Sequence, residues 1–113
     1  MMTQQTKRLG DVDPETLRRW LDDGRAVLID VREPDEHALE RIPEAALIPL
    51  SSFAERIPMP RPGETTVVFH CRSGNRTGKA AELLCQSGFE RVYHLAGGIE
   101  AWKRAGYRTE GAR

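Results

Sequence analysis

The chain has 113 residues, of which 39% are hydrophobic, and a formal net charge of zero at pH 7. This length predicts one domain around one core, residues 10–107, with flexible ends at 1–9 and 108–113. The balanced charge gives no general attraction for nucleic acid, and no apolar run approaches the roughly 18–20 residues that span a membrane.

The first predicted helix begins at Asp13 and Pro14, because Asp is a favoured N-cap and Pro suits the first helical position. Gly24 supplies a C-terminal stop. A short branched apolar run at residues 26–30 then predicts a strand covered on both faces, and residues 33–40 predict a short helix or turn. The buried face of the first helix is marked by three apolar residues at helical spacing: Leu17, Trp20 and Leu21.

Prolines interrupt the middle of the chain. Residues 45–50 predict a second short buried strand that Pro49 limits, and Ser51 is the predicted cap of a brief helix that runs through Ile57. Residues 58–64 are rich in Pro and Gly and predict a loop, which is too short to separate two domains.

The second half of the chain alternates strands and helices. Apolar runs at residues 66–70 and 91–95 predict strands, and residues 77–87 between them predict a helix. A Gly97-Gly98 turn precedes a closing helix at residues 99–106. This alternation indicates an α/β fold with a mostly parallel sheet and helices on both faces. Ligands of such sheets bind beyond the carboxyl ends of the strands.

The segment HCRSGNRTG, residues 70–78, lies between a predicted strand and a predicted helix. A loop in this place points backbone N–H groups toward its centre, and the helix N-terminus adds roughly half a positive charge. Arg72 and Arg76 add two full charges. Gly74 lets the loop curl, and Asn75 tolerates a left-handed backbone. The sequence therefore predicts an anion-binding backbone nest that begins at the cysteine.

Cys71 is the predicted reactive group of this loop. A thiol titrates near about 8.5, and cations with a helix N-terminus lower that value, so we expect a thiolate at neutral pH. An inert buried cysteine is the ordinary alternative, but the flanking guanidinium groups argue against it. Cys85 lies within a helical pattern and is assigned to packing. His70 could act as a base, but strand alternation points its side chain away from that of Cys71, which favours a structural role.

Nothing in the cysteine and histidine spacing predicts a metal site or a cofactor. The two cysteines are fourteen positions apart, they are too few for a disulfide framework, and the three histidines are scattered. Residues 1–10 lack the apolar core of a signal peptide. We therefore expect reduced thiols and a cytoplasmic location.

Three segments resemble, in order, the hallmark segments of the rhodanese-like sulfurtransferases: residues 28–50 (LIDVREPDEHALERIPEAALIPL), 67–84 (VVFHCRSGNRTGKAAELL) and 92–107 (VYHLAGGIEAWKRAGY). The resemblance covers nearly the whole chain, as a single-domain member of the thiosulfate sulfurtransferase type. It implies a three-layer fold with a central, mostly parallel five-stranded sheet flanked by helices. It also implies ping-pong chemistry, in which a thiolate takes sulfur from thiosulfate, releases sulfite and passes the persulfide sulfur to a thiophilic acceptor.

The resemblance also implies site residues. Cys71 is similar to the nucleophile and persulfide carrier, and Arg72 and Arg76 are similar to the groups that bind the anionic donor and tune the thiolate. Asp30 and Arg32 match the pair that braces the active-site loop, and this role is favoured over the alternative of a local ion pair. The remaining loop residues would bind the substrate through backbone N–H groups: Ser73, Gly74 and Asn75.

One segment departs from the family pattern. Glu40 to Glu44 replaces the usual Gly-His-Ile-Pro-Gly, so the turn at Glu44 does not require a positive φ. Similar variation is found in members whose rhodanese domain precedes two transmembrane helices. The chain is therefore expected to be either a stand-alone enzyme or a domain of a membrane-tethered protein.

Two other classes of function remain open. Cysteine phosphatases and arsenate reductases also use a Cys-to-Arg anion loop, but they place five residues between the two, whereas four lie between Cys71 and Arg76. A persulfide carrier, sensor or interaction module with slow turnover would keep the same thiol. The expected partners are a small anionic sulfur donor and an acceptor, which is cyanide in vitro and a thiol or thioredoxin-like protein in cells.

Overall fold

The computed structural model describes residues 8–111 and contains a single five-stranded sheet in that range. The strand order is β1-β5-β4-β2-β3, and every pair is parallel. This confirms the predicted fold class. The strands are β1 (Gly10–Val12), β2 (Val27–Asp30), β3 (Ala46–Leu47), β4 (Thr66–His70) and β5 (Arg91–Leu95).

Strand β1 was not predicted from the sequence pattern. It has three residues and pairs with β5 in a register that sets Val12 opposite Leu95. Three residues are too few to show an alternation of apolar and polar side chains, so only the neighbouring strand identifies this segment as part of the sheet.

Six helical segments surround the sheet in the described range. The first, α1, starts as predicted, because the carboxylate of Asp13 accepts the backbone N–H of Thr16 at 2.8 Å and Pro14 is the first helical residue. Gly24, with φ +67°, follows the end of α1. The helices are α1 (Pro14–Asp22), α2 (Pro34–Leu39), the 3-10 helix η1 (Leu50–Glu55), α3 (Asn75–Lys79), α4 (Ala81–Leu84) and α5 (Gly98–Arg104).

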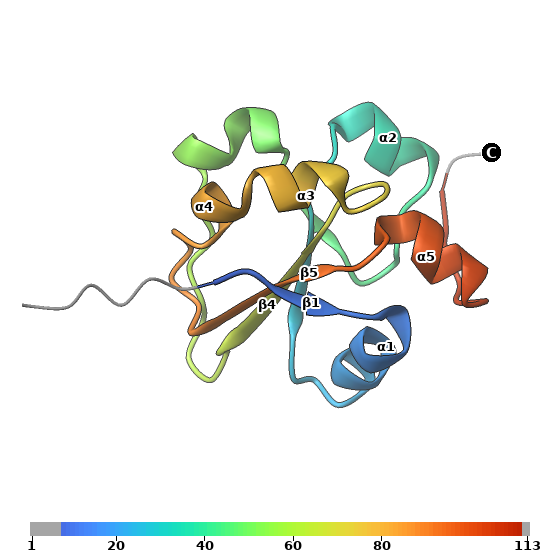
Figure 1. Ribbon diagram of the computed structural model, residues 1–113, viewed down its shortest axis with the longest axis horizontal. Coiled ribbons are helices and arrows are strands. Elements are labelled where there is room, and N and C mark those ends of the chain that lie inside the picture. The colour runs from blue at the N-terminus through green and yellow to red at the C-terminus, as the bar shows by residue number, and fades with distance from the viewer. Residues whose placement is uncertain (1–7, 112–113) are drawn as a thin grey trace, which may run out of the picture.

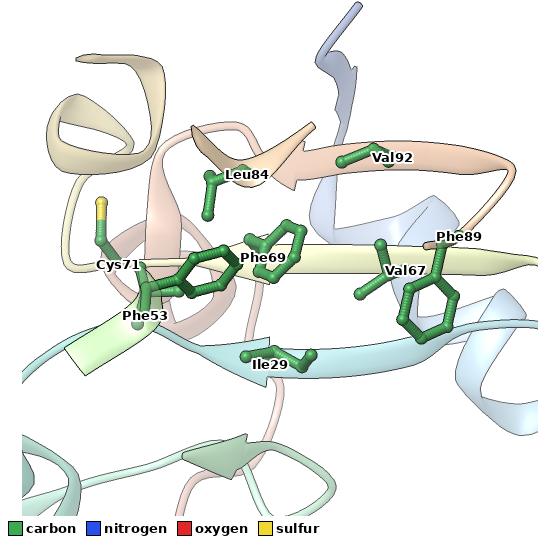
Figure 2. Close-up of a cluster of buried hydrophobic side chains, with 9 residues drawn as sticks. Ile29, Phe53, Val67, Phe69, Cys71, Leu84, Phe89 and Val92 are labelled. Carbon is green, nitrogen blue, oxygen red and sulfur yellow. The ribbon is translucent and has the colours of Figure 1, made fainter. Parts of the chain in front are cut away.

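The sheet separates two apolar clusters, which gives three layers (Figure 1). On one face η1 and α4 contribute Phe53 and Leu84, which pack with Phe69 and other side chains of β2, β4 and β5 (Figure 2). On the other face α1 and α5 contribute Leu17 and Trp102. All five residues of β4 are buried, as expected for a central strand covered on both sides.

The expectation for residues 45–50 is wrong in extent and burial. Only Ala46 and Leu47 form a strand, which lies at the edge of the sheet, and Ala46 is exposed. Ser51 does not cap the next helix, because η1 already begins at Leu50 after Pro49. The Leu50 N–H still bonds to the carbonyl of Val31 at 3.0 Å, but Pro49 has no N–H to extend the ladder, and the strand ends at Leu47.

The single helix expected at residues 77–87 is two short helices. The first, α3, begins two residues earlier at Asn75, and the backbone leaves helical geometry at Ala80 (φ −97°, ψ 17°) before α4 starts. Gly78 lies within α3, and glycine weakens a helix by about 1 kcal/mol relative to alanine. Leu84 of α4 is fully buried.

Residues 108–110, expected to lie beyond the domain, contact its body. The Trp102 indole N–H donates to the carbonyl of Arg108 at 3.0 Å, and Glu110 forms a β-bridge with Arg41. Residues 1–7 and 112–113 of the expected flexible ends lie outside the described residues. Within residues 8–111 no helix is long and apolar enough to cross a membrane.

Candidate active site

Cys71 lies at the carboxyl end of the central strand β4, where the fold places ligands. Its side chain forms one end of an apolar cluster, and its sulfur points toward α3 (Figure 2). The residue is only 1% exposed. Its Sγ accepts the backbone N–H of Gly74 at 3.2 Å and lies 3.7 Å from the hydroxyl oxygen of Thr77. The sulfur is therefore held by the loop that follows it.

Gly74 makes the curl of this loop possible. Its φ is +95°, and a Cβ at this position would lie 3.3 Å from the backbone nitrogen of Gly97. Asn75 is not left-handed, contrary to expectation: it is the first residue of α3, because Gly74 alone makes the turn. Ser73 is exposed, like Asn75.

Two opposing effects act on the pKa of the Cys71 thiol. Burial raises it, because the thiolate loses hydration. The backbone N–H and the hydroxyl of Thr77, together with the N–H groups of Gly74 and Ser73, lower it and outweigh the burial. The net pKa is lower than that of an ordinary thiol, so the loop favours a reactive thiolate.

Both arginines of the loop are paired with carboxylates. Arg76 makes a bidentate pair with Glu36 of α2, at 2.8 and 2.9 Å, and Arg72 bonds through Nε to Glu100 of α5 at 2.9 Å. The Arg72 side chain is 70% exposed. The groups in direct contact with the sulfur are thus neutral donors, the Gly74 N–H and the Thr77 hydroxyl. The guanidinium groups of Arg72 and Arg76 lie outside them and bond to carboxylates.

Asp30 and Arg32 form a buried pair at the carboxyl end of β2. The guanidinium of Arg32 donates to both carboxylate oxygens, and its backbone N–H adds a third bond at 2.9 Å. His37 of α2 lies 2.8 Å from the same carboxylate. Burial would raise the pKa of Asp30, but the hydrogen bonds from Arg32 and His37 outweigh it and hold that pKa at about 2. Through His37, the Asp30 carboxylate holds α2 in place, and α2 positions Glu36 to bond to Arg76.

His70 has a structural position next to Cys71. It is fully buried, and its Nδ1 lies 3.0 Å from the backbone carbonyl of Cys71. A carbonyl only accepts, so Nδ1 carries the proton, and the unprotonated Nε2 lies 3.8 Å from the carboxylate of Asp30. Burial lowers the pKa of His70, which keeps the ring neutral.

The Gly97-Gly98 turn holds the loop from the side of α5. The N–H of Ile99 donates to the carbonyl of Cys71 at 3.0 Å, and the N–H of Glu100 donates to that of Arg72 at 3.1 Å. Gly98 has a φ of +61°, and a Cβ there would lie 2.4 Å from the Arg72 carbonyl oxygen. Only glycine permits this approach, so the turn is structural, as its sequence indicates.

Sequence reasoning missed Thr77 and Glu36. Thr77 is fully buried beside the sulfur, and its position six residues after Cys71, at the far end of the loop, was the available signal. Glu36 has no comparable signal, because it is one of several acids in a polar helix and becomes special only by contacting Arg76.

A surface hollow of about 270 Å³ lies beside the loop. Its wall includes Arg72, Arg32 and Ile99. Another hollow, of about 330 Å³, lies around the amino ends of β2, β4 and β5, at the opposite end of the strands from Cys71. Of these two hollows, the one lined by Arg72 is therefore the one that adjoins the Cys71 loop.

The comparisons with known proteins agree with this geometry. Residues 13–105 match the model of the rhodanese-like domain. A sulfurtransferase of Allochromatium vinosum is 39% identical over 99 residues, which cover 87% of this chain and 92% of that protein. The structure of a human single-domain sulfurtransferase superposes with a TM-score of 0.74 at 27% identity, over 92% of this chain and all of that one.

Other relatives are longer than this chain. An uncharacterised protein of Synechocystis is 38% identical over 109 residues, which cover 96% of this chain and 60% of that protein. A probable adenylyltransferase/sulfurtransferase of Mycobacterium tuberculosis is 37% identical over 102 residues, which cover 88% of this chain and 26% of that protein. The same domain therefore occurs alone and within larger proteins.

Proposed function

This chain belongs to the rhodanese-like sulfurtransferase family, and we propose that it moves the sulfane sulfur of thiosulfate through a persulfide on Cys71. The Cys71 thiolate attacks the outer sulfur of thiosulfate, the sulfur–sulfur bond of the donor breaks, and sulfite leaves with the electron pair. An acceptor thiolate then attacks the terminal sulfur of the persulfide, and the Cys71 thiolate is released. In both steps one bond to the transferred sulfur forms as another breaks, so neither step needs an external oxidant or reductant.

The observation that carries this proposal is the short distance from Gly74 N–H to Cys71 Sγ inside a loop of four intervening residues. The donors that stabilise a thiolate at this position also suit a persulfide, whose terminal sulfur carries the negative charge. Arg72 supports an anionic donor. The only side-chain hydrogen bond that Arg72 makes within the described residues is through Nε to Glu100, and we propose that its terminal nitrogens bind the incoming dianion.

The proposed acceptor is a small thiol or a thioredoxin-like protein, with cyanide as a laboratory substitute. Cytoplasmic location is part of the proposal, because the nucleophile must stay reduced between turnovers. Asp30 and Arg32 are proposed to position the loop rather than to bind substrate, since both are buried.

Cysteine phosphatase chemistry is the nearest alternative for the same thiol. The loop opposes it: four residues separate Cys71 from Arg76, and the Arg76 guanidinium is occupied by both oxygens of Glu36. A persulfide carrier with slow turnover shares the first half-reaction. It would differ by failing to release sulfur to acceptors at a steady rate.

Intact mass spectrometry after thiosulfate treatment tests the proposal. We expect a gain of about 32 Da in the wild type and in Cys85→Ser, and no gain in Cys71→Ser. Steady-state assays with cyanide and with a thiol then separate an enzyme from a carrier. An equal gain in Cys71→Ser, or turnover of p-nitrophenyl phosphate without sulfur transfer, would overturn the proposal.

A further inference from the structure

A chain of hydrogen bonds runs from the active-site sulfur to the protein surface. Thr77 Oγ1 lies 3.7 Å from Cys71 Sγ and 2.6 Å from His94 Nδ1. The other ring nitrogen of His94, Nε2, lies 2.7 Å from Asp11 Oδ1. The four residues come from four places in the chain, namely the end of β4, α3, β5 and β1. Adjacent strands β1 and β5 set Asp11 opposite His94.

The depth of these groups changes steadily along the chain. Cys71 and Thr77 are buried, the His94 side chain is 13% exposed, and that of Asp11 is 76% exposed. The chain thus links a sulfur shielded from water to a carboxylate in contact with it. None of the bonds that position the loop backbone requires this arrangement, so it needs an explanation of its own.

The donors and acceptors of the chain allow two states. In the first, the Asp11 carboxylate accepts the Nε2–H of a neutral His94 ring, so Nδ1 is bare and accepts the Thr77 hydroxyl proton. Thr77 Oγ1 then faces the Cys71 thiol only as an acceptor. In the second, both His94 nitrogens carry protons, Nδ1–H donates to Thr77, and the Thr77 proton is free to bond to the sulfur.

Passing from the first state to the second ionises the cysteine without losing a proton to solvent. The Cys71 S–H proton moves to Thr77 Oγ1 while the Thr77 proton moves to His94 Nδ1. The products are a Cys71 thiolate that accepts from Thr77 and an imidazolium whose Nε2–H faces the Asp11 carboxylate. The carbonyl of Gly74, 3.2 Å from Thr77 Oγ1, is a competing acceptor in either state.

Resting on the assignment of Cys71 as the nucleophile, we propose that His94 and Asp11 are positioning residues that act through Thr77. His94 takes up the proton that Thr77 passes on from Cys71, the Asp11 carboxylate stabilises the resulting imidazolium, and the thiolate is held ready for attack. His94 and Asp11 act without touching the substrate, which distinguishes them from a catalytic base in contact with the reacting sulfur. Other groups face His94 across a hollow of about 380 Å³: Arg8 before β1, Glu82 of α4, and Cys85 directly after α4.

The rate at which iodoacetamide alkylates Cys71 as a function of pH, followed by peptide mass spectrometry, tests the relay without sulfur transfer. His94→Asn keeps a hydrogen-bond partner for Thr77 but cannot take up a proton. Asp11→Asn removes only the carboxylate charge beside His94 Nε2. We expect alkylation of Cys71 at pH 7 to slow about three- to tenfold in both, and in Thr77→Val, with Thr77→Ser near the wild type. Asp23→Asn, another exposed acid, is the matched control and should not change the rate.

A second readout separates the relay from a packing role. In ¹⁵N-histidine NMR spectra, alkylation of Cys71 should shift the His94 ring resonances, identified by their loss in His94→Asn, and leave those of His37 in place. Wild-type alkylation profiles in folded Asp11→Asn and His94→Asn, or unmoved His94 resonances, would overturn the proposal. If the relay variants respond as expected but thiosulfate leaves no persulfide, the proposed sulfur transfer fails and the relay stands.

Discussion

The ion pairs on the two sides of the active-site loop use the same chemistry at different depths. Asp30 and Arg32 have side chains 0% and 6% exposed, whereas those of Arg72 and Glu100 are 70% and 39% exposed. Removing one partner of a buried pair costs about 3–5 kcal/mol, whereas an exposed pair contributes about 0–1 kcal/mol. The inner pair therefore supports the fold beneath the site, and the outer pair keeps a cation at the surface, where we propose that it meets the anionic donor.

The largest expected effect comes from Asp30→Ala, which leaves the buried Arg32 guanidinium without its carboxylate. We expect the free energy of unfolding in urea to fall by about 3–5 kcal/mol. Asp23→Asn, an exposed acid, is the control and should stay within about 0.5 kcal/mol of the wild type. A loss below about 1 kcal/mol in Asp30→Ala would mean that burial does not distinguish the two pairs.

The backbone contact on the α5 side is tested by Gly98→Ala. Gly98 and Gly106 both have positive φ, but a Cβ on Gly98 would meet the Arg72 carbonyl, while a Cβ on Gly106 would meet nothing within 4 Å. We expect Gly98→Ala to cost about 1–3 kcal/mol more stability than Gly106→Ala, measured by thermal or urea unfolding. Equal losses would show that φ strain alone, and not the contact with the loop, governs this turn.

The free energy of unfolding, measured in urea as a function of pH, should fall in acid. The folded pKa of Asp30 is about 2 against an ordinary 3.8, so the stabilisation that Asp30 contributes is complete above pH 4 and is lost as the pH falls toward 2. That contribution is about 2 kcal/mol. Glu36, whose bond from Arg76 holds its pKa at about 2, loses its contribution over a similar range.

Salt separates the two carboxylates. The Glu36–Arg76 pair is partly exposed, so 1 M NaCl should screen it and flatten its part of the acid dependence, while the buried Asp30 pair persists. Glu36→Gln in low salt should reproduce the high-salt profile of the wild type. Complete loss of the acid dependence in salt would place Asp30 in contact with solvent and would contradict its burial.

The smallest effect on stability is expected for Arg72→Ala, about 0–1 kcal/mol, because its pair with Glu100 is exposed. In thiosulfate:cyanide assays the same variant should raise KM severalfold, since the outer cation is lost. The pH profile of Cys71 alkylation should stay close to that of the wild type, because the bonds from Thr77, Gly74 and Ser73 remain. A large shift of the alkylation profile to higher pH in Arg72→Ala would show that Arg72, and not the neutral donors, lowers the pKa of Cys71.

Sequence patterns predicted the parts of the fold that depend on neighbouring residues. The cap at Asp13, the apolar run of β4 and the glycine turn before α5 were all predicted correctly, because each follows from local sterics or local hydrogen bonding. Strand β1 was missed because only its pairing with β5, far along the chain, identifies it. The break at Ala80 was missed although Gly78, a local signal, weakens the helix there. The buried strand expected at residues 45–50 was wrong because its place at the edge of the sheet depends on tertiary structure.

For the site, the sequence by itself determined the position of Cys71, which we propose as the nucleophile, the loop length and the glycine that lets the loop curl. These properties lie within nine consecutive residues, 70–78, and a loop between a strand and a helix can be recognised from the residues on either side of it. Only the tertiary structure decided which groups surround the sulfur. It paired the arginines with Glu36 and Glu100 and brought His94 and Asp11 to Thr77, because the parallel sheet places residues distant in sequence at adjacent strand ends. The two arginines that flank Cys71 in the sequence bond to carboxylates outside the sulfur site, and the neutral donors of Thr77, Gly74 and Ser73 stabilise the thiolate.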